Sequence, residues 1–493
     1  MDTINRIRVF ILSLPNMVIR FIFSIPALFN RFCNGLEVSF NMLTQALPLI
    51  CSYVFGVGLI PIIILYFVGG LKDETNHTDP DVFAGVSLAL MFTNVTGLSV
   101  LIGMAGAVET MASQLFGAGR LREVGYCVQR SILVLSMTCV PILIIWCLAA
   151  IIFHRIGISD TVCRIVDITV KLRMLGLPMD VFRCTFERYL TAVGVTEPLM
   201  IASLIFDGLL ILLCILNNEI FGLGYVGIML SFVIASYISG FYMLLTSVFY
   251  QAVKATLQLP HESALLHMAD FVSLGLSGVV MLCSEWWAYE ILTIFASLIS
   301  TQAIDAQAII ITTIGLAYCV LLGVSMVVSV SIGNLIGQDT NRDAKYIGTV
   351  GLVAIVYVQT AISMCIYLFG HQYLTLFTND TEVTTIALDS MRYLPIFVVG
   401  DGLQCIGGAI LRGAGKQSVG ALLNFISFYI VGLPMSWIFC FKLDYGVCGL
   451  LMGMSCANYC QIVAQLYLIY FCSDYIFNNN GLWLHYSPIP GDG

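Results

Sequence analysis

Long apolar stretches dominate this chain. A helix needs about 20 mostly apolar residues to cross the hydrocarbon core of a bilayer. Stretches of this length that carry no charge are 46–71, 82–108, 131–153, 220–253, 306–338, 346–370, 417–441 and 445–473. Three more, at 198–218, 268–299 and 393–411, carry acidic residues only. Residues 165–190 are richer in charge, but without them every later span would be inverted. The sequence therefore predicts an all-α polytopic membrane protein with twelve transmembrane helices.

The composition excludes a soluble protein. Hydrophobic residues make up 59% of the chain and charged residues 10%, against about 45–50% and about 25% in soluble domains. In water such a chain would expose large apolar patches. The net charge is −8 and there is no long basic run, which argues against a nucleic-acid partner. The 17 cysteines are scattered through apolar stretches without a CxxC motif, so we expect packing residues rather than disulfides or a metal site.

The positive charges predict the orientation in the membrane. If the N-terminus is inside, 13 Lys and Arg residues fall in inner loops and 4 in outer loops, so both termini are predicted to be cytoplasmic. Residues 7–30 are apolar but interrupted by Arg and Pro, and we expect a helix in the headgroup plane there. The sequons at Asn76 and Asn379 lie in outer loops and are glycosylation candidates. We expect a plasma-membrane location, with an endomembrane vesicle or vacuole as the alternative.

The sequence of the first half recurs in the second. Leu177-Pro178 recurs 217 residues later as Leu394-Pro395, and the GYVG at 224–227 recurs 222 residues later as GVCG. A repeat of six spans gives both copies the same orientation, which predicts two six-helix bundles with a substrate cavity between them. The predicted parts are an N-terminal segment 1–36, an N-lobe 37–251, a cytoplasmic linker 252–267, a C-lobe 268–472 and a cytoplasmic tail 473–493.

Three motifs resemble one family of transporters. GMAGAVETMASQLFGAGR at 103–120 and LRGAGKQSVGALLNFISFYIVGLP at 411–434 resemble span signatures of the multidrug and toxic compound extrusion (MATE) family, and EWWAYE at 285–290 resembles the seventh-span motif of its eukaryotic members. The resemblance covers residues 37–472. It implies an antiporter that exports organic cations in exchange for protons, or in some branches sodium ions. We expect a transporter rather than an enzyme, working as a monomer without a cofactor.

Carboxylates inside the predicted spans are the first candidates for function. An ionised carboxylate at membrane depth costs about 2.5–3.5 kcal/mol on insertion scales, and no Lys or Arg occurs in 255–341 to pair with Glu285 or Glu290. The two lie about 140° apart around a helix, so they do not share one face. A carboxyl group in apolar surroundings can exchange a proton near neutral pH. Proton and cation coupling is therefore predicted for Glu285, Glu290 and Asp401, although a structural role explains Glu290 equally well.

Aromatic and polar residues near these acids are candidates for the substrate cavity, because aromatic faces attract organic cations. Aromatic side chains in spans also serve as packing and interface anchors. Thr312 stands where the resemblance leads us to expect a Glu. Asp180 is predicted to pair with a neighbouring Lys171, Arg173 or Arg183, and Glu109 with Arg120 or Arg122. The cavity candidates are Trp286, Trp287, Tyr289, Tyr318, Gln307 and Asp207.

Other functions fit the sequence less well. A sodium-coupled exporter of the same fold remains an alternative. A lipid-linked oligosaccharide flippase would need basic cavity residues for pyrophosphate. An intramembrane aspartyl protease would need a GxGD-type motif, and Val398-Val399-Gly400 before Asp401 does not match it. An acyltransferase would need a histidine at membrane depth, and a channel a filter or charged ring, none of which the sequence shows.

Overall fold

The computed structural model describes residues 37–71, 80–375 and 380–477, and the regular structure in these residues is helical. The predicted headgroup helix at 7–30, the sequons at Asn76 and Asn379 and the end of the tail lie outside the described residues.

The first half of the chain forms six long helices, several of which contain a π-helical turn. The first runs over Glu37–Gly69 and ends in η1 (Val54–Leu59) and α2 (Ile60–Gly69). The remaining elements are α3 (Pro80–Thr93), η2 (Asn94–Leu98), α4 (Ser99–Gly117), α5 (Leu121–Cys147), α6 (Ala149–Ile156), α7 (Asp160–Ala192), α8 (Glu197–Leu216), η3 (Asn217–Phe221) and α9 (Gly224–Ser247).

A short linker follows, with α10 (Gln251–Thr256) and the 3-10 turn η4 (Glu262–Leu265). The second half then repeats the pattern of long helices. Its elements are α11 (Met268–Ser297), α12 (Thr301–Gly337), α13 (Asn341–Leu374), α14 (Thr381–Met391), α15 (Leu394–Gly413), α16 (Gln417–Phe425), η5 (Ile426–Gly432), α17 (Leu433–Trp437), η6 (Ile438–Lys442), α18 (Gly446–Phe471) and α19 (Ser473–Phe477).

The prediction of twelve membrane-spanning helices is confirmed. Eleven helices of the described residues are long and apolar enough to cross a membrane, and the charged α7 is the twelfth. Its buried charges are paired: Arg173 Nη1 lies 2.7 Å from Asp180 Oδ2, which confirms the predicted pairing of Asp180. The third span begins at Leu121, ten residues before the predicted start. This first part of α5 is polar because it holds the linker.

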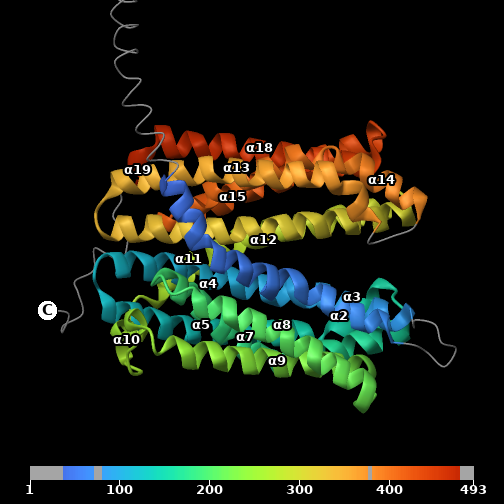
Figure 1. Ribbon diagram of the computed structural model, residues 1–493, viewed down its shortest axis with the longest axis horizontal. Coiled ribbons are helices and arrows are strands. Elements are labelled where there is room, and N and C mark those ends of the chain that lie inside the picture. The colour runs from blue at the N-terminus through green and yellow to red at the C-terminus, as the bar shows by residue number, and fades with distance from the viewer. Residues whose placement is uncertain (1–36, 72–79, 376–379, 478–493) are drawn as a thin grey trace, which may run out of the picture.

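The two halves of the chain lie one above the other in Figure 1, with the helices of the first half in blue to green and those of the second in yellow to red. They touch through small residues. A Cβ on Gly103 of α4 would lie 2.6 Å from the Cα of Val279 of α11, and one on Gly117 would lie 2.1 Å from the backbone oxygen of Asn334 of α12. Only glycine allows helices to approach this closely.

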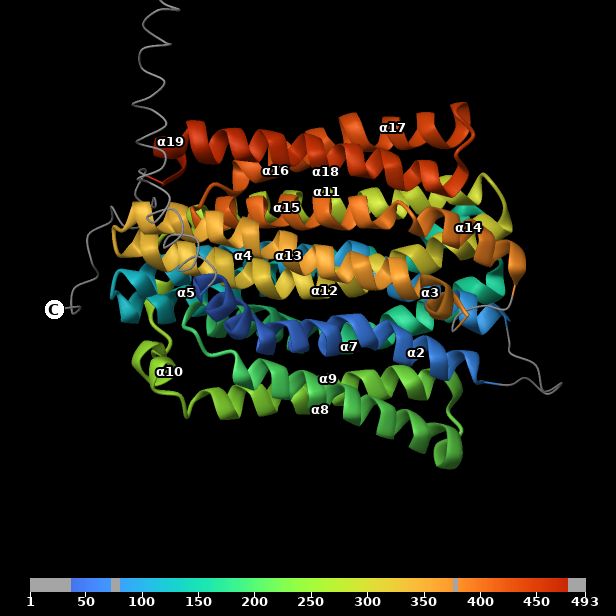
Figure 2. The same cartoon turned by 45° about the horizontal axis from the view of Figure 1, so that its top comes forward.

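One end of the bundle carries the linker, and we call it the linker end. There Gln129 of α5 donates hydrogen bonds of 2.9 Å to the backbone oxygens of Gln258 and Leu259, and Arg130 donates one of 3.0 Å to Ala264 O. Figure 2 shows α10 at the same end as the start of α5. The linker is therefore fastened to the first half of the chain.

Candidate functional site

Two of the predicted coupling residues meet inside the second half. Glu285 of α11 and Asp401 of α15 are only 7% and 4% exposed. The amide nitrogen of Gln404 lies 3.4 Å from Glu285 Oε1 and 3.4 Å from Asp401 Oδ1. Residues 401 and 404 are one helical turn apart on α15, so both face α11. The structure thus brings together two carboxyl groups that share a single amide donor.

A network of amides, which the sequence reasoning missed, holds this donor in place. Gln461 of α18 donates hydrogen bonds of 3.0 Å to Gln404 Oε1 and 2.6 Å to Asn424 Oδ1. Asn424 in turn donates a hydrogen bond of 2.8 Å to the backbone oxygen of Met281. Asn458, Gln461 and Gln465 are fully buried and lie on one face of α18. Their spacing within an uncharged span was a signal in the sequence, because amides at membrane depth need partners.

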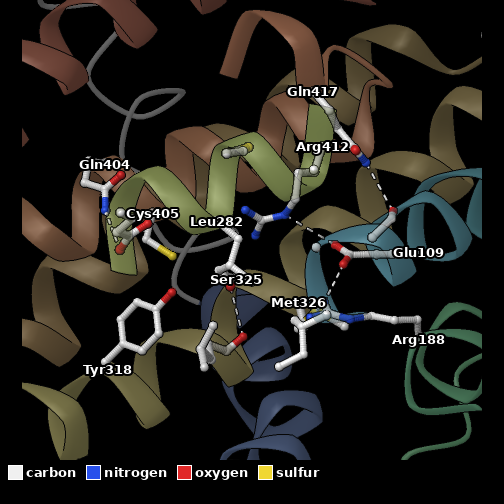
Figure 3. A pocket seen from close by; sticks show the side chains of 17 residues that line it. Glu109, Arg188, Leu282, Tyr318, Ser325, Met326, Gln404, Cys405, Arg412 and Gln417 are labelled. Carbon is white, nitrogen blue, oxygen red and sulfur yellow. Dashed lines mark hydrogen bonds and ion pairs between the residues drawn. The ribbon is translucent and has the colours of Figure 1, made fainter. Parts of the chain in front are cut away.

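A cavity of about 60 Å³ lies between the halves beside Glu285. Figure 3 shows its lining, with Gln404, Cys405 and Tyr318 on one side and Glu109, Arg188 and Arg412 on the other. The Tyr318 hydroxyl points toward Cys405. One water molecule takes up about 30 Å³ in the liquid, so this inner cavity has room for a few waters only. In this conformation the inner cavity is too small for an organic cation next to Glu285.

Glu109 joins three helices at the other side of the inner cavity. Its side chain is completely buried on α4. Oε2 accepts a 2.6 Å hydrogen bond from Arg188 of α7, and Oε1 lies 3.7 Å from Arg412 Nε of α15 (Figure 3). A carboxylate that is buried this deeply needs such partners to remain charged. Glu109 therefore connects the first half of the chain to the second.

The predicted pairing of Glu109 with Arg120 or Arg122 is wrong. Arg120 forms hydrogen bonds of 2.6 and 2.7 Å with Glu123 instead. Glu109 lies eight residues before the end of α4 at Gly117, about 12 Å along the helix axis, so it is too far inside the bundle. The structural partner Arg188 was not singled out from the sequence, because a sequence does not show which charges on separate spans face each other.

The other acidic candidates lie apart from the pair. Glu290 is half-buried and does not line the inner cavity beside Glu285, in agreement with the prediction that the two acids lie on different helix faces. Asp207 of α8 is buried in the first half, and neither carboxylate oxygen has a hydrogen-bond partner among the described residues. Thr312, where a Glu was expected, donates 2.8 Å to Ala308 O of its own helix. Glu285 and Asp401 are thus the only predicted coupling residues that meet in the described part of the chain.

The predicted aromatic residues divide between cavity and packing. Tyr318 lines the inner cavity, and Trp286 contacts Tyr318. Trp287 is 42% exposed and donates a hydrogen bond of 3.2 Å to Val95 O. Tyr289 packs edge-on against Phe397, with the two ring centroids 6.4 Å apart. Gln307 is buried, and its side-chain oxygen has no partner among the described residues; it does not line the inner cavity.

Comparisons with known proteins agree with this architecture. The MatE family model matches residues 48–216 and 279–438. Multidrug and toxin extrusion protein 1 of Danio rerio is 31% identical over 394 residues, which are 80% of this chain and 67% of that protein. The human protein of the same name is 29% identical over 388 residues, covering 77% and 67%.

The fold is also that of solved transporters. The eukaryotic MATE transporter AtDTX14 superposes with a TM-score of 0.82 at 20% identity, over 91% of this chain and 99% of that one. A MATE transporter of Vibrio cholerae gives 0.78 at 16% identity, over 90% and 98%. The predicted twelve-helix MATE-like fold is confirmed. The chain is an integral, multi-pass membrane protein and belongs to the multidrug and toxin extrusion (MATE) family of transporters.

Proposed function

We propose that this protein exports organic cations across the membrane in exchange for protons by alternating access. The observation that carries the proposal is the buried pair of Glu285 and Asp401 on one amide of Gln404, next to a cavity between the two halves. The names of the relatives, multidrug and toxin extrusion proteins, support the substrate class. The excess of basic residues on inner loops supports a cytoplasmic linker end.

The chemistry of the pair favours exchange. Two ionised carboxylates repel each other, and Gln404 offers both only one NH₂ group. An organic cation that enters the cavity relieves this repulsion, and the Tyr318 ring offers an aromatic face to it. A proton that reaches one carboxyl group from outside removes a negative charge and thereby releases the cation. Binding of cation and proton is then mutually exclusive, which is what an antiporter requires.

The charge of the inner cavity argues against the flippase alternative. A lipid pyrophosphate would need basic groups that are free to bind it. The two basic residues among the described lining, Arg188 and Arg412, both face Glu109. The remaining acid, Glu285, would repel a pyrophosphate. An organic cation therefore fits the lining better than a phosphate ester.

Transport by reconstituted full-length protein tests the proposal. We expect proteoliposomes with an acidic lumen to accumulate tetraethylammonium, and Glu285→Gln and Asp401→Asn each to slow uptake at least about tenfold, equivalent to about 1.4 kcal/mol. Glu262→Gln, which removes an exposed acid of the linker, is the control. Normal uptake by Glu285→Gln would contradict the role of the pair. Uptake driven by an outward sodium gradient alone would favour the sodium-coupled alternative.

A further inference from the structure

A second, larger cavity lies between the two halves at the linker end, and we call it the vestibule. Its volume is about 430 Å³, within the range of about 300–1,000 Å³ typical of small-molecule sites. Pro48 of the first helix, Glu197 at the start of α8 and Tyr250 after α9 line it from the first half; Ser331 and Asn334 of α12 line it from the second. In this conformation the vestibule offers far more room than the inner cavity.

The vestibule has the side chains that recognise an organic cation. The Tyr250 hydroxyl donates a 2.8 Å hydrogen bond to Glu197 Oε2. This bond and partial burial raise the pKa of Tyr250, so the phenol stays a donor and fixes the carboxylate beside its ring. The side-chain oxygen of Asn334 is buried without a partner among the described residues. Among the described lining residues Glu197 is the one acid and there is no Lys or Arg. A carboxylate beside an aromatic ring attracts quaternary ammonium groups.

The vestibule adjoins the inner cavity. Thr191 lines it one helical turn after Arg188 of α7, and Val327 of α12 directly follows Met326; Arg188 and Met326 both line the inner cavity. Arg188 also contacts Met326. The ion pair of Glu109 and Arg188 therefore lies between the two cavities. The vestibule therefore lies next to the inner cavity, on its linker-end side.

Two other large cavities do not suit a cation. The groove between α12 and α13, about 340 Å³, is lined by residues without charge, such as Leu316 and Phe369. The cavity at the opposite end, about 430 Å³, is lined by Arg155 and Arg164 against the single acid Asp167. Neither combines a net negative charge with an aromatic ring, as the vestibule does.

We infer that the vestibule is a capture site for organic cations, in which Glu197 and Tyr250 bind the cation at the cytoplasmic face before it reaches Glu285 and Asp401. The inference rests on the proposed function for its substrate class and for the orientation. It adds a second binding site, on the far side of the Glu109–Arg188 pair, to the carboxyl pair of the inner cavity.

Equilibrium binding of radiolabelled tetraethylammonium to the purified full-length protein tests the site directly. We expect the double variant Glu285→Gln/Asp401→Asn to retain a binding component that the further change Glu197→Gln weakens at least about tenfold. Tyr250→Phe keeps the ring and loses the hydrogen bond, so it should weaken tetraethylammonium binding less than Tyr250→Leu does. Glu262→Gln is the matched control, because it removes an exposed acid at the same end. A melting temperature equal to that of the wild type shows that each variant is folded.

Transport then separates this inference from the proposed function. For cations added at the linker end, Glu197→Gln should raise KM about tenfold and leave the maximal rate nearly unchanged, because it removes binding before the exchange step. Coupled transport with unchanged KM and unchanged binding in Glu197→Gln would overturn the capture site and leave the proposed function standing. Binding that depends on Glu197 in a protein without proton-coupled transport would overturn the proposed function alone. A wild-type protein that binds no tetraethylammonium would overturn the capture site.

Discussion

At the residue scale, the buried ion pair of Glu109 with Arg188 leads to a prediction about stability. Glu109 is completely buried, and its one short contact is with Arg188. We expect Arg188→Gln to lower the free energy of unfolding by about 3–5 kcal/mol, because the variant leaves a buried charge without its partner. Glu109→Gln/Arg188→Gln should lose less than Arg188→Gln alone. Unfolding in mixed micelles with increasing SDS measures both.

An exposed pair gives the control for this cycle. Arg392 Nη1 lies 3.2 Å from Asp389 Oδ1, and both side chains are at least 60% exposed. Such pairs contribute about 0–1 kcal/mol, so Arg392→Gln should change the free energy of unfolding little. If the double variant at 109 and 188 is less stable than Arg188→Gln, the ion pair is not what makes Glu109 tolerable at this depth.

Residues of the site were partly predictable. A carboxyl group inside an apolar span stands out by its cost, and this signal identified Glu285 and Asp401 from the sequence. Amides cost less and did not stand out, so Gln404, which both carboxyl groups share, was missed. The partner of Glu109 was wrongly predicted because a charge pair between α4 and α7 depends on how the spans pack. Periodicity within one span carries no information on that packing.

At the scale of elements, glycines on α4 and α12 let the two halves approach closely at the linker end. A Cβ on Gly337 would lie 2.1 Å from the backbone oxygen of Gln114, whereas one on Gly315, also on α12, would meet nothing within 4 Å. We expect Gly337→Ala to destabilise the protein by about 1–3 kcal/mol, because backbone must move to admit the methyl group. Thermal unfolding measures the loss. Gly315→Ala is the control, and an equal loss there would show that helix propensity or lipid contact, not the close approach, decides the effect.

Helices were predicted well where a stretch is both uncharged and long enough to cross a membrane, and less well elsewhere. The apolar stretch 306–338 falls on α12, which begins five residues earlier, at Thr301, and ends at Gly337. The predicted span 131–153 did not include the polar start of α5. A search for apolar runs excludes residues such as Gln129 and Arg130, which form hydrogen bonds with the linker. The charged α7 was retained only by the topology argument. Its charges are satisfied by pairs such as Arg173 with Asp180, which hydropathy does not register.

At the scale of the whole molecule, the passage from the linker end to the inner cavity is closed in this structure. Gln114 of α4 donates 2.9 Å to Gly413 O of α15, and Gln417 donates 3.1 Å to Gly106 O of α4. These bonds join the first half to the second across the inner cavity. A cation from the vestibule reaches Glu285 only after the two halves separate here, as alternating access requires.

Hydrogen–deuterium exchange of the wild-type protein tests this motion without labels. The pH is lowered from about 8 to about 6, in the range where buried carboxyl groups at functional sites titrate. After correction for intrinsic rates, exchange at the two ends of the bundle should change in opposite directions. The segments to compare are 114–120 and 331–338 at the linker end, and 60–70 and 299–306 at the opposite end. Opposite directions are expected because a rocking motion opens one end as it closes the other. In Glu285→Gln/Asp401→Asn the response to pH should disappear, whereas in Glu262→Gln it should persist. Exchange that rises or falls together at both ends would show that protonation of the pair loosens the molecule as a whole instead of moving one half against the other.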